Sequence, residues 1–582
     1  MALLASAPVD TGRRSYHFRG IQTNEQEDGI QEVSTPEQRA RQEIDRLLCA
    51  VGWLVQDLKS ADLHAARGVA LREFELNPGH GTADFLLYVD GKACGVIEAK
   101  KQGATLTGVE AQSARYAQGL PPTLPAWQRP PPFVYESTGI ETHFTQGLDP
   151  VPRARPVFAF NRPETLAEWL AQANADPPPA PATVLTTDGQ PPPAEAQRPT
   201  GGTMLARLQA MPPLVTEWGD FKLWPAQITA ILNLEASLAQ NKPRALIQMA
   251  TGSGKTFTAI SFIYRLIKFA GARRVLFLVD RGNLGRQTKK EFDQYVSPVN
   301  NYKFGEEYIV QHLTSNNLDK TARVCISTIQ RMFSMLKGRE LSDEADEEST
   351  ERVEGLFGKE TEPIDYNPAF PIETFDIIVT DEAHRSIYNL WRQVLEYFDV
   401  HLIGLTATPN RQTFGFFNQN LVMEYGHPQA AADGANVNYD VYRIKTEVTE
   451  AGATVKAGYW LQVLDKPTRA RRLTLATTRL DDDFEYAPEQ LDRSVQSPDQ
   501  IRTIARTLRD RWQSDLFPQW QELPKTLVFA KDDDHAEAIV GILREEWAAA
   551  TSSRRRSPTP PRELSPNSRT RPSAPANTRA WP

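Results

Sequence analysis

Met249-Ala250-Thr251-Gly252-Ser253-Gly254-Lys255-Thr256 is the stretch of sequence that decides the fold. A short apolar run precedes it, and an apolar run typical of a helix follows it, from Phe257 to Phe269. A strand, a Gly-rich loop and a helix in this order form a phosphate cradle, because glycines admit backbone N–H groups and a helix N-terminus favours negative charge. Lys255 is expected to reach the β- and γ-phosphates of ATP, and Thr256 to place its hydroxyl on Mg²⁺. The predicted nucleotide-binding residues of the loop are Thr251, Gly252, Ser253, Gly254, Lys255 and Thr256.

A second stretch supplies the acidic half of such a site. The strand-like run from Phe375 to Thr380 ends in Asp381-Glu382-Ala383-His384. Asp381 at a strand end is suited to hold Mg²⁺, and Glu382 beside it to polarise the attacking water. The next apolar run leads into Thr406-Ala407-Thr408-Pro409. At this point the chain resembles a superfamily 2 helicase or translocase motor of the DEAH-box type.

Other segments agree with this resemblance. LWPAQ ends at Gln227, the residue that the resemblance assigns to reading adenine. The segments from Val275 to Gln287 and from Val324 to Gln330 resemble the DNA-contacting motifs of a first motor domain. The resemblance also implies that His384 couples the nucleotide site to Thr406 and Thr408. The alternative is an ordinary α/β domain without nucleotide, and the matching elements in the right order argue against it.

The whole chain has the composition of a soluble protein with several domains. It has 582 residues, of which 40% are hydrophobic and 24% charged, and its net charge is −8. Nucleic-acid contacts must therefore come from local basic patches. Three widely spaced cysteines indicate reduced thiols. Because neither a signal peptide nor an apolar run of about 20 residues is found, a cytoplasmic protein without membrane contact is expected.

A different catalytic centre is predicted in the segment ADFLLYVDGKACGVIEAKK, residues 83–101. Asp84 starts one strand-like run, and Glu98 and Lys100 point to one face of the next because they are two residues apart. Two carboxylates that hold Mg²⁺ beside a lysine that orients water form the nuclease constellation of the PD-(D/E)xK type. A strict two-residue turn would put Asp84 and Glu98 on opposite faces, so we predict an odd-length loop or one bulge near residues 89–92. The alternative is a surface hairpin with scattered charges.

The surrounding sequence favours the nuclease. Gln112 and Tyr116 lie at i, i+4 and resemble an accessory Gln-x-x-x-Tyr pair. Together with the motor motifs and the segments at 133–148 and 157–170, the chain from about residue 35 to about residue 545 resembles the restriction (R) subunit of type I restriction-modification enzymes. Glu43 is interpreted as a solvated helix residue. The resemblance implies ATP and Mg²⁺ as cofactors, double-stranded DNA as substrate, and separate methyltransferase (M) and specificity (S) subunits as partners.

The expected fold is a multidomain α/β protein with a PD-(D/E)xK nuclease-like domain, a RecA-like parallel motor domain and an incomplete second RecA-like domain. The predicted boundaries are a mobile arm (1–33), the nuclease (34–172), a Pro-rich linker (173–203), the first motor domain (204–415), a connecting region (416–505), the incomplete second motor domain (506–548) and a disordered basic tail (549–582). Strand-like segments are predicted at 437–446 and 525–530, and the acidic run at 343–348 is interpreted as a solvated insertion. Arginines and lysines between 273 and 290 are candidates for contacting a DNA backbone, with ordinary surface charge as the alternative.

The last part of the chain breaks the pattern. Residues 551–582 are rich in Ser, Pro and Arg and cannot form a core. The later motifs of the second motor domain, with their arginines, are not recognisable. We interpret this as a truncated or frame-shifted product, and the alternative is a natural disordered tail. The predicted function is ATP-dependent translocation and cleavage of unmodified duplex DNA. A stand-alone helicase–nuclease, or an inactive remnant that only binds nucleotide or DNA, are the competing hypotheses.

Overall fold

A computed structural model describes residues 35–106, 118–174, 202–347, 363–442, 444, 498–530 and 533–554, and four short strands between 453 and 486. The chain divides into two compact units, Met1–Asn438 and Tyr439–Pro582. Four predicted features lie wholly or mostly outside the described residues: the N-terminal arm, the pair Gln112 and Tyr116, the Pro-rich linker and the basic tail. None of the described helices is long and apolar enough to cross a membrane.

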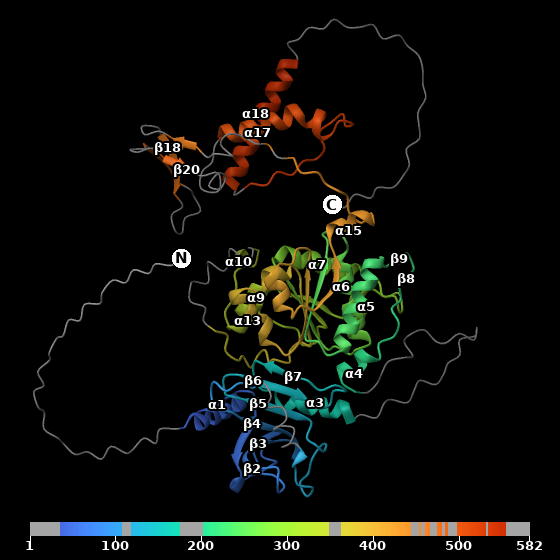
Figure 1. Ribbon diagram of the computed structural model, residues 1–582, viewed down its shortest axis with the longest axis vertical. Coiled ribbons are helices and arrows are strands. Elements are labelled where there is room, and N and C mark those ends of the chain that lie inside the picture. Colours follow the sequence, from blue (N-terminus) through green and yellow to red (C-terminus); the bar gives the residue numbers. More distant parts are fainter. Residues whose placement is uncertain are drawn as a thin grey trace, which may run out of the picture. The chain divides into compact units, whose positions relative to one another are not determined.

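The Gly-rich loop follows one strand of a seven-stranded parallel sheet (Figure 1). Its order is β12-β13-β11-β14-β15-β10-β16, and every neighbouring pair is parallel. The strands are β10 (Arg244–Met249), β11 (Val275–Val279), β12 (Val310–His312), β13 (Val324–Thr328), β14 (Ile377–Thr380), β15 (His401–Thr406) and β16 (Leu421–Tyr425). Every residue of β11, β13 and β14 is buried, as expected for a parallel sheet covered on both faces.

Helices cover both faces of this sheet. The core on one face packs side chains of α5 (Pro225–Ala239) and α6 (Lys255–Lys268) on alternate strand residues. The core on the other face packs α9 (Ile329–Leu336) and α13 (Asn389–Tyr397) on the remaining ones. Figure 1 shows these two pairs of helices on opposite sides of the strands. The arrangement confirms the predicted RecA-like α/β fold, in which ligands bind at the carboxyl ends of the strands.

The shorter elements of this part complete the sheet edges and loops. The helices are α4 (Met204–Gln209), α7 (Gly282–Gln294), α8 (Phe304–Glu307), α10 (Asp343–Glu347), α12 (Ala383–Ser386), α14 (Arg411–Phe416) and α15 (His427–Ala432). A two-stranded ribbon is formed by β8 (Glu217–Trp218) and β9 (Phe221–Lys222).

A second seven-stranded sheet is built from the N-terminal part of the chain, in the order β1 to β7. The strands are β1 (Leu54–Asp57), β2 (Gly68–Glu75), β3 (Thr82–Val89), β4 (Lys92–Ala99), β5 (Phe133–Ser137), β6 (Thr142–Gln146) and β7 (Ala154–Val157). The pairs β1–β2 and β4–β5 are parallel and the others antiparallel. A 3-10 turn, Leu58–Ser60, follows β1, and α1 (Pro36–Ala50) and α3 (Pro163–Asn174) pack against the sheet. Thr35 and Gln38 form a capping box at the start of α1.

The hairpin of β3 and β4 contains the bulge that the sequence required. Asp90 and Gly91 form a two-residue turn, both with positive φ, between the paired residues Val89 and Lys92. The register then shifts, because Tyr88 pairs with Ala93 whereas Leu87 pairs with Gly95. The extra residue is Cys94, so the bulge lies slightly beyond the predicted range of 89–92. Its effect is the predicted one, since it turns Asp84 and Glu98 to the same face.

The N-terminal sheet docks on the parallel sheet through buried ion pairs. Arg155 of β7 makes a two-pronged contact with Asp399, at 2.6 and 2.8 Å, directly before β15. Glu373, close before β14, accepts hydrogen bonds from Arg162 and Thr165 at 2.7 and 2.6 Å. Because both carboxylates are buried and accept charged hydrogen bonds in a defined geometry, these contacts favour one orientation of the two sheets. The N-terminal sheet therefore sits at the amino ends of β14 and β15.

Two predicted strands are absent from the second unit and from the end of the first. Residues 437–442 and 525–530 have no regular structure, and Val437, Leu527 and Phe529 are between 77% and 86% exposed. An isolated strand cannot satisfy its backbone groups without a neighbour. No described strand pairs with either segment, which explains why both predictions were wrong.

The remaining elements of the second unit are small. The strand pairs are β17 (Ala453–Val455) with β20 (Phe484–Tyr486), and β18 (Trp460–Asp465) with β19 (Thr474–Arg479). Helix α17 spans Pro498–Arg511, and a π-helical turn, Trp512–Leu516, follows it. Helix α18 (Asp533–Arg554) packs against α17 and extends past the predicted domain end at residue 548.

The acidic run is only partly the solvated insertion that was predicted. It forms α10, in which Asp346 is buried and contacts Arg331 at 3.0 Å. Glu347 lies at the N-terminus of α7, where it accepts a hydrogen bond from the Asn283 amide at 2.9 Å and pairs with Arg286 at 2.7 Å. Buried guanidinium groups and helix N-termini both attract carboxylates, so this part of the run has internal partners.

Candidate active sites

The Gly-rich loop has the backbone of a phosphate cradle. Gly252 and Gly254 both have φ of 81°, a conformation that favours glycine. The Ser253 side chain is buried and donates to the Ala250 carbonyl at 2.6 Å, which fixes the loop from inside. Lys255 and Thr256 begin α6, so their amides and side chains stand where a phosphate would be attracted. Thr251, at the start of the loop, accepts a hydrogen bond from Asn436 at 2.9 Å.

Gln227 lies against this loop, as its proposed role in reading adenine requires. Its side chain is buried, and its Oε1 accepts the Trp224 amide at 2.9 Å. The Nε2 end approaches Gly254 so closely that a side chain at that glycine would collide with it. The residue therefore lies beside the Gly-rich loop in space, as the resemblance implies.

Asp381 and Glu382 stand at the carboxyl end of β14. Burial and the neighbouring Glu382 raise the pKa of Asp381 to about 6, while Lys255 acts to lower it. Lys255 and Glu291 of α7 are therefore close enough to act on Asp381 electrostatically, and Glu291 is hydrogen-bonded to Thr256. Two adjacent carboxylates and a hydroxyl are the hard oxygen ligands that Mg²⁺ prefers.

His384 connects the acidic pair to the following strand. Its Nδ1 lies 3.0 Å from the Thr406 hydroxyl at the end of β15, and the same hydroxyl accepts the Thr408 amide at 3.2 Å. His384 also lies 3.5 Å from Glu382. The structure thus brings together the residues for which the resemblance implied coupling, through hydrogen bonds between neighbouring strand ends.

The N-terminal site brings Asp84, Glu98 and Lys100 together. Asp84 accepts the Ala99 amide at 2.7 Å, and Lys100 Nζ lies 2.6 Å from Glu98. Both carboxylates are less than 10% exposed. Burial raises the pKa of Glu98, and the charge of Asp84 and a hydrogen bond to it raise it further, while Lys100 acts to lower it.

The residues of this site fit a divalent cation. Two buried carboxylates in direct contact repel each other when both are ionised, and a cation between them removes the repulsion. No group of three or more His, Cys, Asp or Glu side chains placed to hold a metal occurs within the described part of the chain. Mg²⁺ commonly uses one or two carboxylates and completes its shell with water and phosphate oxygens, so a pair is sufficient.

The sequence analysis missed several groups at the two sites. Arg41 of α1 lies 2.5 Å from Asp84. Glu136 of β5 is fully buried and is paired in register with Glu98 of β4. In the parallel sheet, Glu291 of α7 is hydrogen-bonded to Thr256, and burial raises its pKa. All of these residues come from distant parts of the chain. Glu136 alone carried a local signal, as a charged residue within the apolar run of β5, whereas Arg41 and Glu291 stand among other charged residues.

Most of the basic side chains proposed as DNA contacts have internal partners. Arg286 pairs with Glu347 and Lys289 with Asp293. Arg273 pairs with Asp376 and with Glu168 of α3, and so lies where the two sheets meet. Arg273 is therefore at the end of the parallel sheet opposite to the Gly-rich loop, and its contact with DNA stays a prediction.

Comparisons with known proteins agree with this arrangement. Residues 220–411 match the family model described as "Type III restriction enzyme, res subunit". The chain is 28% identical over 338 residues to the endonuclease subunit of the type I restriction enzyme EcoKI of Escherichia coli (strain K12), covering 55% of this chain and 25% of that protein. The EcoAI endonuclease subunit of Escherichia coli is 29% identical over 332 residues, covering 55% of this chain and 34% of that protein.

Among solved structures, a fragment of an HsdR subunit of a type I restriction enzyme from Vibrio vulnificus YJ016 is similar with 19% identity and a TM-score of 0.31, covering 90% of this chain and 76% of that one. The alignments to the curated relatives span between a quarter and a third of those proteins. Over more than half of its length, the chain is a relative of the endonuclease subunits of type I restriction enzymes, which confirms the resemblance predicted from its sequence.

Proposed function

We propose that this chain acts as a restriction subunit, which hydrolyses ATP to move duplex DNA and cuts that DNA with its N-terminal site. The observation that carries the proposal is the presence, in one compact unit, of a Lys255–Asp381–Glu382 site and of an Asp84–Glu98–Lys100 site. The relationship to restriction endonuclease subunits supports the combination.

In the parallel sheet, Lys255 and the loop amides would hold the phosphates, and Thr256 and Asp381 would hold Mg²⁺, which neutralises developing charge. Glu382 would orient the attacking water. Its proximity to His384, and the bond from His384 to Thr406, support transmission of the nucleotide state to the next strand end.

In the N-terminal sheet, Asp84 and Glu98 would hold Mg²⁺, which activates water and offsets charge on the scissile phosphate. Lys100 is placed to orient the water or to stabilise the phosphate, because its ammonium group already lies beside Glu98. Arg41 neutralises Asp84 in this structure, and its guanidinium is a natural partner for a phosphate when a cation takes its place.

The experiment is to measure ATP hydrolysis and DNA cleavage by the full chain, with and without separately supplied methylation and specificity subunits. Lys255→Ala and Glu98→Gln are the two test variants. We expect Lys255→Ala to abolish both activities and Glu98→Gln to abolish cleavage alone. Cleavage that persists in Glu98→Gln would exclude this nuclease site. Cleavage that needs no partner subunit would favour a stand-alone helicase–nuclease.

One observation favours a second candidate function, a chain that binds nucleotide without turnover. Residues 525–530, which resemble the opening strand of a second motor domain, are unpaired within the described structure and expose Leu527 and Phe529. Hydrolysis in related motors needs arginines from that second domain. Nucleotide binding that disappears in Lys255→Ala, without hydrolysis in the unmutated chain, would support this candidate.

A further inference from the structure

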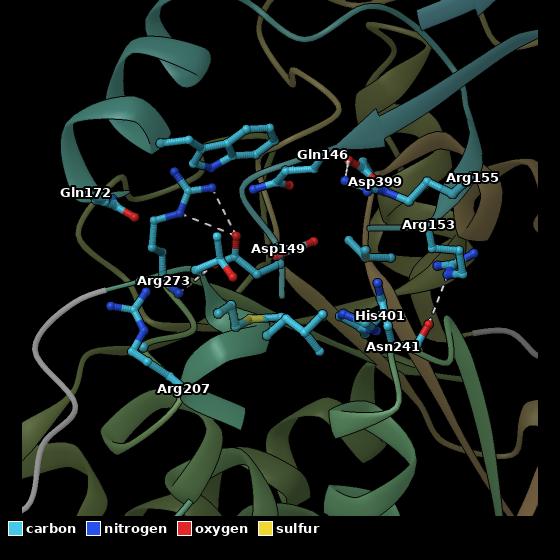
Figure 2. A pocket seen from close by; sticks show the side chains of 18 of the residues that line it. Gln146, Asp149, Arg153, Arg155, Gln172, Arg207, Asn241, Arg273, Asp399 and His401 are labelled. Atoms are coloured by element: carbon cyan, nitrogen blue, oxygen red, sulfur yellow. Dashed lines mark hydrogen bonds and ion pairs between the residues drawn. The ribbon is translucent and has the colours of Figure 1, made fainter. Parts of the chain in front are cut away.

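A cavity lies where the N-terminal sheet meets the parallel sheet, away from both candidate active sites. Its volume is about 410 Å³, which is in the range of small-molecule sites. Its walls come from β6, β7 and α3 on one side, and from α4 and the amino ends of β14 and β15 on the other. Figure 2 shows Arg207 and Arg273 on one side of this cavity and Arg153 on the other.

The lining is rich in positive charge. Five arginines and three aspartates face the cavity. Two of the arginines are neutralised, since Arg155 pairs with Asp399 and Arg273 with Asp376. The remaining three, Arg153, Arg207 and Arg323, face a single further carboxylate, Asp149. The cavity therefore keeps a net positive charge after its internal ion pairs are formed.

Of these three arginines, Arg323 is exposed, whereas Arg153 and Arg207 are half-buried. Arg153 donates to the Asn241 carbonyl at 3.0 Å, and Arg207 to the Ala270 carbonyl at 3.1 Å. Neither forms an ion pair with any carboxylate of the described residues. Burial lowers the pKa of both guanidinium groups, and the charge of Arg155 lowers that of Arg153 further. A partly desolvated cation without a counter-ion carries a cost that a bound anion would reduce.

Asp149 does not complete the charge balance. Its carboxylate accepts a hydrogen bond from Thr203, and burial raises its pKa. The cavity also offers the amide of Gln172 and an apolar wall with Trp169, Met204 and Val400. An aromatic and apolar wall beside guanidinium groups suits a ligand with one anionic end and one flat, less polar end.

From these observations we infer that the cavity binds a small phosphate-bearing molecule of mononucleotide size, with Arg153 and Arg207 as its cationic contacts from opposite sides. The inference is independent of the proposed reaction, because the cavity contains none of the residues assigned to ATP hydrolysis or DNA cleavage. Such a ligand would touch both sheets, so its binding would also stabilise their docking.

The test uses the full chain carrying Lys255→Ala, in EDTA, so that the Gly-rich loop does not contribute to binding. Calorimetric titration is done with AMP, with inorganic phosphate and with adenosine. We expect AMP to bind, phosphate to compete with it, and adenosine to bind at least about tenfold more weakly, because a charged hydrogen bond is lost. Equal binding of adenosine, or no binding of AMP at millimolar concentration, would overturn the inference.

Variants then locate the site. Arg153→Gln with Arg207→Gln is expected to weaken AMP binding at least about tenfold, whereas the lysine pair at the same positions retains most of it. Arg67→Gln, which removes an exposed arginine outside the cavity, is the matched control and should bind as before. Circular dichroism and the melting temperature establish that the glutamine variant is folded. Unchanged AMP affinity in that folded variant contradicts the assignment.

Discussion

Replacing Asp381 by Asn is expected to stabilise the chain when nucleotide and metal are absent. The folded structure raises the pKa of Asp381 from 3.8 to about 6, chiefly by burial. Each pKa unit corresponds to about 1.4 kcal/mol, so ionisation of this carboxyl in the folded state costs up to about 3 kcal/mol. Because the side chain is only half-buried, solvent reduces this, and about 1–2 kcal/mol is the expected gain.

The pH dependence follows from the direction of the shift. A carboxyl whose pKa is higher in the folded than in the unfolded state leaves stability intact at low pH. Stability is lost as the pH rises from about 4 to about 6, and the loss is constant above that. Asn cannot ionise, and it keeps the oxygen that accepts the Glu382 amide at 3.0 Å. The variant should therefore equal the unmutated chain near pH 4 and exceed it at pH 7.

The assay is urea-induced unfolding in EDTA between pH 4 and pH 8. The quantity compared is the free energy of unfolding of the part of the chain that contains the parallel sheet. Asp280→Asn is the matched control, since Asp280 ends the neighbouring strand but is paired with Arg385 at 3.1 Å, and its replacement should destabilise. A stability gain in Asp381→Asn that is independent of pH, or no gain at all, would refute the reasoning. Adding Mg²⁺ and ATP should stabilise the unmutated chain and not the variant.

Three further predictions concern packing and reactivity. Asp399→Ala should lower the free energy of unfolding by about 3–5 kcal/mol, because Arg155 remains buried without its partner, and the apolar pair Arg155→Met with Asp399→Leu should recover most of that loss in urea unfolding. Gly254→Ala should abolish nucleotide binding in a filter-binding assay, since φ is 81° and the new side chain would collide with the Gln227 side chain. Gly415→Ala, whose new side chain would meet no other atom, should bind nucleotide normally. In thiol titration, Cys49 alone should react in the folded chain and all three cysteines after unfolding, because burial raises the pKa of the other two thiols.

The parallel sheet could be predicted because its information is local. Apolar runs of five or six residues, each followed by a loop with specialised chemistry, identify buried parallel strands without reference to the rest of the chain. The edge strands β12 and β16 were not predicted: β12 has only three residues, two of them polar, and most residues of β16 are only half-buried. The strand-like segments at 437–446 and 525–530 failed for the opposite reason, because the pattern was present but no described strand pairs with it.

The bulge in the β3–β4 hairpin shows what parity alone can establish. Two carboxylates that must share a face require one extra residue between them, and this argument is independent of any contact. The position of the extra residue is not encoded locally, because Cys94 is as apolar and as buried as its neighbours. Arg41 and Glu291 were missed because their proximity to the two sites is tertiary.

The way the N-terminal sheet is held has a mechanical consequence. Its ion pairs grip the chain just before β14 and β15, and the same two strands end at Asp381 and Thr406. A strand of four to six residues, hydrogen-bonded on both sides, behaves as a rigid rod. Any rotation of the parallel sheet during a nucleotide cycle would therefore move the N-terminal sheet with it, and the two sheets would turn as one rigid body.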